Sequence, residues 1–197
     1  MLRVVPLLIA YGAWLTFVLT WHSVDRTART IATPPRSRER LYLLVISFGL
    51  VLFVLGPLPY ATGRIWVNPP VLDWAMLLVV ATGIAWCYWA RRHLGRFWSA
   101  SVTHKEGHRV IDSGPYRLVR HPMYTGMIVM DVAIAIICTT PPALLAVPVM
   151  ILGLWLKARV EERFLIEELG AATYAPYQAR TPMLVPRISQ RPGQPIP

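Results

Sequence analysis

The sequence predicts an all-α, polytopic membrane protein with about five transmembrane helices, the last two forming a helical hairpin. Two observations support this fold class. The 197 residues are 55% hydrophobic and only 15% charged, which is too apolar for an ordinary soluble domain. The chain also contains several nearly uncharged runs close to the ~20 residues that a helix needs to cross the hydrocarbon layer.

Three of these runs are long and stand apart from one another: 4–21, 41–61 and 71–90. The first of them lacks a small-residue cleavage pattern at its end, so it is expected to remain as a helix. A fourth apolar region, 123–156, is broken by Thr139-Thr140-Pro141-Pro142 into two shorter arms. These arms predict the tight helical hairpin.

The distribution of Lys and Arg predicts how the helices are oriented. Eighteen of the 20 basic residues fall in the loops 22–40 and 91–122 or in the segment from 157 onward. If five spans alternate, these parts share one side, which predicts an outside N-terminus and a cytoplasmic C-terminus. The net charge of +10 then reflects topology and contact with anionic membrane lipids, at ~1 kcal/mol per nearby charge, rather than nucleic-acid binding.

The same patterns divide the chain into three parts. Residues 1–90 hold the first three transmembrane helices, and 188–197 form a proline-rich tail. Between them, 91–187 hold a cytoplasmic loop, the hairpin and a C-terminal helix, with the last span expected to continue as an amphipathic helix through 157–177. The linker 30–40, which contains two adjacent prolines, is expected to be a flexible connection.

The predicted site begins at the segment 120–126, whose sequence is Arg-His-Pro-Met-Tyr-Thr-Gly. Gly114-Pro115-Tyr116 before it has the chemistry of a turn, and Pro122 forces His121 out of helical geometry. A purely structural helix entry would explain the prolines and glycines. It would not explain why Arg120 and His121 adjoin an apolar hairpin, so we expect a functional site there.

The hairpin should return a second group of polar residues to this site. Glu161 and Glu162 follow the last apolar run and so are expected near Arg120 and His121. Adjacent residues on a helix point ~100° apart, so at most one of the two carboxylates should face a given ligand. An ordinary surface ion pair with a neighbouring arginine is the structural alternative.

Three other features carry weaker signals. Arg and aromatic residues over 91–98 indicate an interfacial belt or, alternatively, an entrance for an amphipathic substrate with an anionic head. His104 and His108 lack a third ligand nearby, so no metal site is predicted, although His108 could bind a polar ligand. Asp131, an acid well inside a span, is a functional candidate or a residue paired with a neighbouring helix.

The motifs together resemble one enzyme superfamily. Gly-Pro-Tyr-x-x-x-Arg-His-Pro-x-Tyr-x-Gly over 114–126, an apolar hairpin, and Arg-x-Glu-Glu-x-x-Leu over 159–165 resemble the isoprenylcysteine carboxyl methyltransferases and phospholipid methyltransferases. The resemblance covers roughly 91–187. It implies an integral membrane enzyme that uses S-adenosylmethionine at a cytoplasmic C-terminal site, with a lipophilic acceptor entering from the bilayer.

The resemblance also implies roles for individual residues. Those matching the polar residues needed for activity are Arg120, Glu161 and Glu162. Those implied to contact the cofactor are His108, Gly114, Pro115, Tyr116, His121, Tyr124 and one of the two glutamates, with Glu162 assigned here.

The acceptor remains open at this stage. A carboxylate, as in isoprenylcysteine O-methylation, is already ionised and needs only a cation such as Arg120 to position it. An amine, as in phosphatidylethanolamine, must lose a proton, which would make a Glu or His the base. The competing classes are an NADPH-dependent sterol-type membrane reductase and a non-enzymatic lipid-binding or small transport protein.

Overall fold

The computed structural model describes residues 4–21, 28–60, 63–107 and 109–187, and these are mostly helical. The α-helices are α1 (Val4–Trp21), α2 (Arg36–Leu55), α3 (Pro70–Leu94), α4 (Pro122–Cys138), α5 (Pro141–Leu169) and α6 (Ala171–Arg180). Shorter elements are the 3-10 turns η1 (Gly95–Phe97) and η2 (Gly114–Arg117) and the strands β1 (Thr30–Ala32) and β2 (His104–Lys105).

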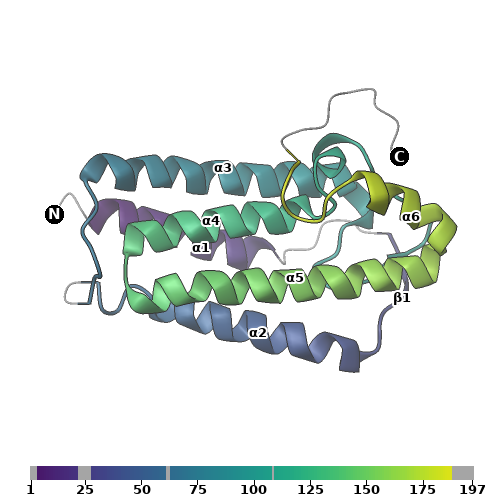
Figure 1. The fold of residues 1–197 in the computed structure, drawn as a ribbon, viewed down its shortest axis with the longest axis horizontal. Helices are drawn as coiled ribbons and strands as arrows, with labels where there is room; N and C mark the ends of the chain where they lie inside the picture. Colours follow the sequence, from purple (N-terminus) through teal and green to yellow (C-terminus); the bar gives the residue numbers. More distant parts are fainter. Residues whose placement is uncertain (1–3, 22–27, 61–62, 108, 188–197) are drawn as a thin grey trace.

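Helices α1 to α5 lie lengthwise beside one another, and α6 sits at one end of this bundle (Figure 1). Helix α4 packs mainly against α3, α5 packs mainly against α2, and α1 contacts α3 and α4. The core between them is apolar and includes Trp14, Phe53, Met130 and Ile134. The ends of α1, α3 and α5 and the starts of α2 and α4 gather at the end where α6 lies (Figure 1).

Three of the helices are long and apolar enough to cross a membrane: α1, α3 with its continuation through η1, and α5. Helix α4 is equally apolar but has 17 residues. Helix α2 has 20 residues but starts with a charged turn, Arg36 to Arg40. These helices fit a multi-pass helical membrane protein, whereas the number of five spans stays a prediction.

The predicted flexible linker over 30–40 is wrong. Residues 30–32 form β1, which pairs antiparallel with β2, and the Lys105 Nζ donates to Thr30 Oγ1 at 2.9 Å. Helix α2 already begins at Arg36, and it ends at Leu55 rather than near 61 because prolines follow in the next turn. Strands of three and two residues are too short to leave a periodic signal in the sequence.

The break between α4 and α5 lies where the sequence predicted it. Thr139 adopts a left-handed conformation with φ 56°, and Pro141 starts α5 two residues later. Helix α5 continues beyond the expected span to Leu169, but the predicted continuation through 177 is wrong, because Gly170, with φ 84°, ends α5 and a separate helix, α6, begins at Ala171. The 29 residues of α5 give a length of ~43 Å, so its final turns, with Glu161 and Glu162, lie beyond the ~20 residues that cross the hydrocarbon.

Helices α3 and α4 approach closely at two glycines, Gly83 and Gly126. A Cβ on Gly126 would lie 2.6 Å from Cys87 Sγ and 3.1 Å from the carbonyl oxygen of Gly83. Small residues at such crossings let membrane helices pack through their backbones. The last residue of the predicted motif, Gly126, therefore serves helix packing.

We expect Gly126→Val to destabilise the protein by ~1–3 kcal/mol, because the added side chain forces α3 and α4 apart. The thermal unfolding of the detergent-solubilised protein, followed by tryptophan fluorescence, measures this loss. Gly12→Val is the matched control, since nothing lies within 4 Å of a Cβ at that position. Equal melting temperatures for the two variants would contradict the close crossing.

Candidate active site

Arg120 is held by a buried ion pair with Glu162. Its Nε donates to Glu162 Oε1 at 2.6 Å, and its Nη2 donates to Oε2 at 3.1 Å. The remaining nitrogen, Nη1, donates to the main-chain oxygens of Gln178, at 2.9 Å, and Thr181. Since the two charged side chains are only 9% and 4% exposed, the pair ties the start of α4 to α5 and α6.

Glu162 accepts two further hydrogen bonds. They come from His121 Nε2 at 3.0 Å and from the Gln178 side-chain amide at 2.9 Å. Burial alone would raise the pKa of Glu162, but the hydrogen bonds and charges of His121 and Arg120 lower it to about 2. The carboxylate is therefore ionised at neutral pH and only accepts, so the Nε2 of His121 carries the proton that it donates.

Glu161 points in a different direction from its neighbour, as the helical geometry predicted. The Tyr124 hydroxyl donates to Glu161 Oε2 at 2.7 Å, and His121 Nδ1 lies 3.8 Å from the same oxygen. The rings of His121 and Tyr124 stack with centroids 5.3 Å apart. Glu161 is 30% exposed and lines a cavity, whereas Glu162 does not line it.

The segment after α6 closes the site from the side. The main-chain N–H of Arg120 donates to the carbonyl oxygen of Pro182 at 2.8 Å. The main-chain N–H of His121 donates to the carbonyl oxygen of Met183 at 3.1 Å. These bonds fix the backbone of the Arg-His pair, and Pro122 then starts α4 with His121 in a non-helical conformation, as predicted.

The turn η2 positions Tyr116. Gly114 has φ 57°, and a side chain there would also overlap the ring of His93. The main-chain oxygen of Tyr116 accepts a hydrogen bond from the Tyr177 hydroxyl at 2.8 Å. The Tyr116 hydroxyl is buried and has no hydrogen-bond partner among the described residues. Burial raises the pKa of Tyr116, so this hydroxyl is an available donor. Gly114 and Pro115 shape the turn and do not line the cavity.

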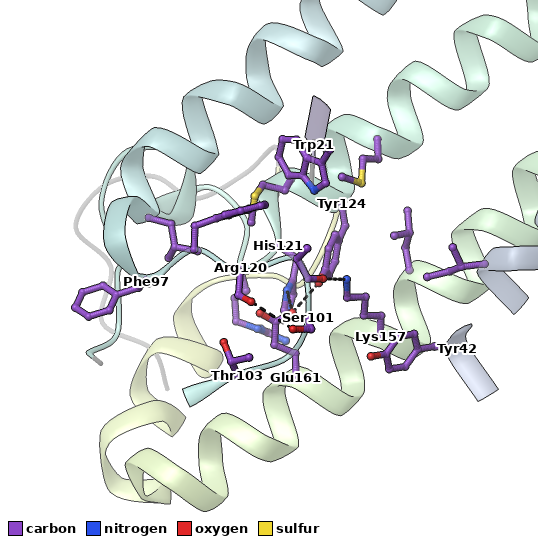
Figure 2. Close-up of a pocket in the computed structure, with 18 of the residues that line it drawn as sticks. Trp21, Tyr42, Phe97, Ser101, Thr103, Arg120, His121, Tyr124, Lys157 and Glu161 are labelled. Atoms are coloured by element: carbon purple, nitrogen blue, oxygen red, sulfur yellow. Dashed lines mark hydrogen bonds and ion pairs between the residues drawn. The ribbon is translucent and has the colours of Figure 1, made fainter. Parts of the chain in front are cut away.

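The cavity has a volume of about 370 Å³ and joins a polar end to an apolar one. Arg120, His121, Tyr124 and Glu161 line the polar end, where Figure 2 shows them together. Along α4 the lining extends from Met123 to Asp131, which is ~12 Å at 1.5 Å per residue. The apolar lining comes from α1, α2, α4 and α5 and includes Trp14, Phe17, Leu50, Met127, Met150 and Leu154.

The structure brings together most of the residues predicted for the site. Hydrogen bonds and ion pairs connect five of them, Arg120, His121, Tyr124, Glu161 and Glu162. Tyr116 lines the same cavity, and His108 lies outside the described residues. Asp131 lines the apolar part of the cavity, and one of its carboxylate oxygens is buried without a partner in the described part of the chain. Arg91 does not line the cavity, because it packs over the Trp98 ring at 3.7 Å.

Sequence reasoning missed two contributions to the site. Gln178 anchors both Arg120 and Glu162, yet no local signal distinguishes it from other polar residues on α6. Lys157 lines the cavity and is half-buried. A signal for Lys157 existed, since it is the first charge after the last apolar run and precedes Glu161 by four residues on the same helix face.

Comparisons with known proteins show which sequences this chain resembles. Residues 75–167 match the model of the isoprenylcysteine carboxyl methyltransferase (ICMT) family. The chain is 30% identical over 151 residues to the cobalt-zinc-cadmium resistance protein CzcN of Cupriavidus metallidurans, covering 74% of this chain and 64% of that protein. It is 23% identical over 88 residues to protein-S-isoprenylcysteine O-methyltransferase B of Arabidopsis thaliana, covering 45% of each.

The fold and the site define a helical membrane protein whose polar site opens into a cavity between its membrane helices. The predicted resemblance to the isoprenylcysteine carboxyl methyltransferase superfamily is confirmed over residues 75–167, and it points to a membrane methyltransferase. The matches span less than two thirds of the length of both relatives.

Proposed function

We propose that this protein transfers a methyl group from S-adenosylmethionine to the carboxylate of a lipophilic acceptor that enters from the bilayer. The observation that carries the proposal is a continuous cavity, which joins the Glu161 end to an apolar lining from four helices. Such a cavity can bring a polar cofactor and a lipid tail into contact, and its volume is within the range of small-molecule sites.

The residues at the polar end fit the implied cofactor. S-adenosylmethionine carries a sulfonium and an ammonium group, and Glu161 offers a carboxylate at the cavity wall. The buried Tyr116 hydroxyl, which has no partner in the described chain, offers a hydrogen bond to a polar group of a ligand. The role proposed for Glu162 differs from the cofactor contact that the resemblance implied. Glu162 would support the cofactor site through Arg120 and His121 rather than contact the ligand.

When bound, S-adenosylmethionine supplies an electrophilic methyl group, whose transfer to a carboxylate oxygen breaks the carbon–sulfur bond, leaves the electron pair on sulfur and forms an ester. The protein's part is alignment and exclusion of water, and alignment alone can contribute ~7–11 kcal/mol. Tyr124 holds Glu161 by its 2.7 Å hydrogen bond, while Arg120 and Glu162 fix the backbone around them.

Glu162 is unsuited to act as the base that an amine acceptor would require. An amine acceptor requires a base, and a carboxylate with a pKa of about 2 in a buried ion pair is a poor one. A carboxylate acceptor requires no base. The amine-methylating alternative would leave Glu161 or His121 to take the proton.

The proposal includes five spans, with the N-terminus outside and the site on the cytoplasmic face. Eighteen of the 20 Lys and Arg residues fall in the segments 22–40, 91–122 and 157–197, as positive-inside topology requires. The helix ends that adjoin these segments gather at the end of the bundle where α6 lies (Figure 1). Helices α1 and α2 of the N-terminal part also line the cavity, so they would help to bind the acceptor tail.

Incubation with radiolabelled methyl donor, total membrane lipid extract and a farnesylcysteine analogue tests the reaction. We expect base-labile label, because a methyl ester releases methanol in alkali. Base-stable label in the lipid fraction would indicate an amine acceptor instead. Binding of S-adenosylhomocysteine to the solubilised protein is the parallel measurement, and no binding at saturating ligand together with tight NADPH binding would indicate a reductase.

A further inference from the structure

Lys157 places a half-buried positive charge in the wall of the cavity. Its Nζ donates to the carbonyl oxygen of Ala100 at 2.7 Å and lies 5.5 Å from the centre of the Tyr124 ring and 6.0 Å from that of Tyr42. Figure 2 shows the side chain between these two tyrosines. An ammonium group in such surroundings has lost part of its hydration, which is costly unless another group compensates for it.

The described residues leave this charge only partly compensated. A lysine ammonium has three donors, and one of them is used on Ala100. No carboxylate in the described part of the chain lies within 4 Å of Nζ. Arg120 differs, because its nitrogens already donate to Glu162 and to two main-chain oxygens. Lys157 is therefore the better placed of the two cations to bind a ligand anion.

The position of Lys157 along α5 matches an amphipathic ligand. Met150, Leu154, Lys157 and Glu161 all line the cavity, and their spacing of four, three and four places them on one helix face. The wall therefore presents apolar groups first, then a cation, then a carboxylate. A ligand with a lipid tail and an anionic head would place that head beside Lys157, one turn from the proposed cofactor end.

We propose that Lys157 binds the anionic head of the methyl acceptor and so selects a carboxylate acceptor. This inference rests on the proposed function and deepens it, because it names the residue that recognises the acceptor. Two ligands have the chemistry that Lys157 would recognise, an anion on an apolar tail. They are a lipophilic carboxylate and a phospholipid phosphate. Aromatic and apolar neighbours strengthen the attraction because they keep water away from the charges.

Binding measurements with a neutral and a charge-retaining variant test the proposal. The probes are N-acetyl-farnesylcysteine, its neutral carboxamide, and a single-chain phosphatidate, each titrated into the detergent-solubilised protein. We expect wild-type protein to bind the carboxylate at least ~10-fold more tightly than the carboxamide, as one charge-assisted hydrogen bond allows. Lys157→Met should remove this preference, and Lys157→Arg should retain it within about threefold.

Two controls separate this proposal from the proposed function. Lys105→Met removes the other lysine, which lies outside the cavity, and should leave the carboxylate preference unchanged. S-adenosylhomocysteine affinity should be the same in all variants, which shows that each is folded. A carboxylate preference that persists in folded Lys157→Met would overturn the proposal.

The remaining outcomes are also decisive. If the wild-type protein binds no S-adenosylhomocysteine, the melting temperature in detergent shows instead that each variant is folded. Loss of carboxylate preference in a Lys157→Met protein that melts as the wild type does would then support anion binding by Lys157 and reject the methyltransferase proposal. If the phosphatidate binds more tightly than the carboxylate and depends on Lys157, the anion site is supported and the acceptor is a phospholipid. Equal binding of all three probes by wild-type protein would overturn the role of Lys157.

Discussion

Arg120→Ala is expected to abolish methyl transfer while the protein still inserts into the membrane. The substitution leaves Glu162 as a buried carboxylate without its arginine, and breaking a buried pair in this way costs ~3–5 kcal/mol. It also frees the two main-chain oxygens near the end of α6 that Arg120 holds. Activity with radiolabelled methyl donor and the melting temperature in detergent should therefore fall together.

Arg38→Ala is the matched control for Arg120→Ala. Arg38 also forms an arginine–glutamate pair, with Glu167 at 2.7 Å, but both side chains are about half exposed. Exposed pairs contribute ~0–1 kcal/mol, so this variant should resemble the wild-type protein. Full activity of purified Arg120→Ala would contradict the assignment of Arg120 to the site.

The two adjacent glutamates should respond differently to loss of charge. Glu161→Gln removes the carboxylate at the cavity wall but leaves the Arg120 pair intact, so we expect normal melting and at least ~10-fold weaker S-adenosylhomocysteine binding. Glu162→Gln leaves the Arg120 guanidinium buried without a counter-charge, so we expect a lower melting temperature as well as lost activity. The double variant should be inactive but membrane-inserted.

Calorimetric titration and thermal unfolding of both single variants measure this difference. Glu167→Gln serves as control, because that carboxylate lies on the same helix in an exposed pair with Arg38. If Glu161→Gln binds S-adenosylhomocysteine as the wild type does, Glu161 does not contact the cofactor. If Glu162→Gln melts normally, the buried pair does not hold the site together.

Much of the fold could be predicted because membrane helices leave strong one-dimensional signals. The run 4–21 and the break at Thr139-Thr140 both correspond to observed elements, since apolar length and proline act locally. The short pairing of β1 with β2 could not be predicted, because it depends on contacts across more than 70 residues. The start of α2 at Arg36 could not be predicted either, because the charged residues of its first turn are typical of a loop between membrane spans.

The sequence could predict which residues meet in the site, but it could not predict the role of each residue. Arg120 and Glu162 were expected to meet because a turn between helices brings their ends together. That their charges would neutralise each other depends on Gln178 and Thr181, which approach Arg120 only in three dimensions. For the same reason the sequence favoured Arg120 as the cation for the acceptor, whereas in the fold Arg120 is paired with Glu162 and Lys157 also lines the cavity.

The hydrogen bonds from Arg120 and His121 to Pro182 and Met183 have a consequence for biosynthesis. During translation, all the apolar helices are synthesised before residues 182 and 183. Until then the backbone of the Arg-His pair has no partner on that side, and the guanidinium lacks the oxygen of Thr181. The nascent chain can therefore acquire its membrane topology first and its chemical competence last.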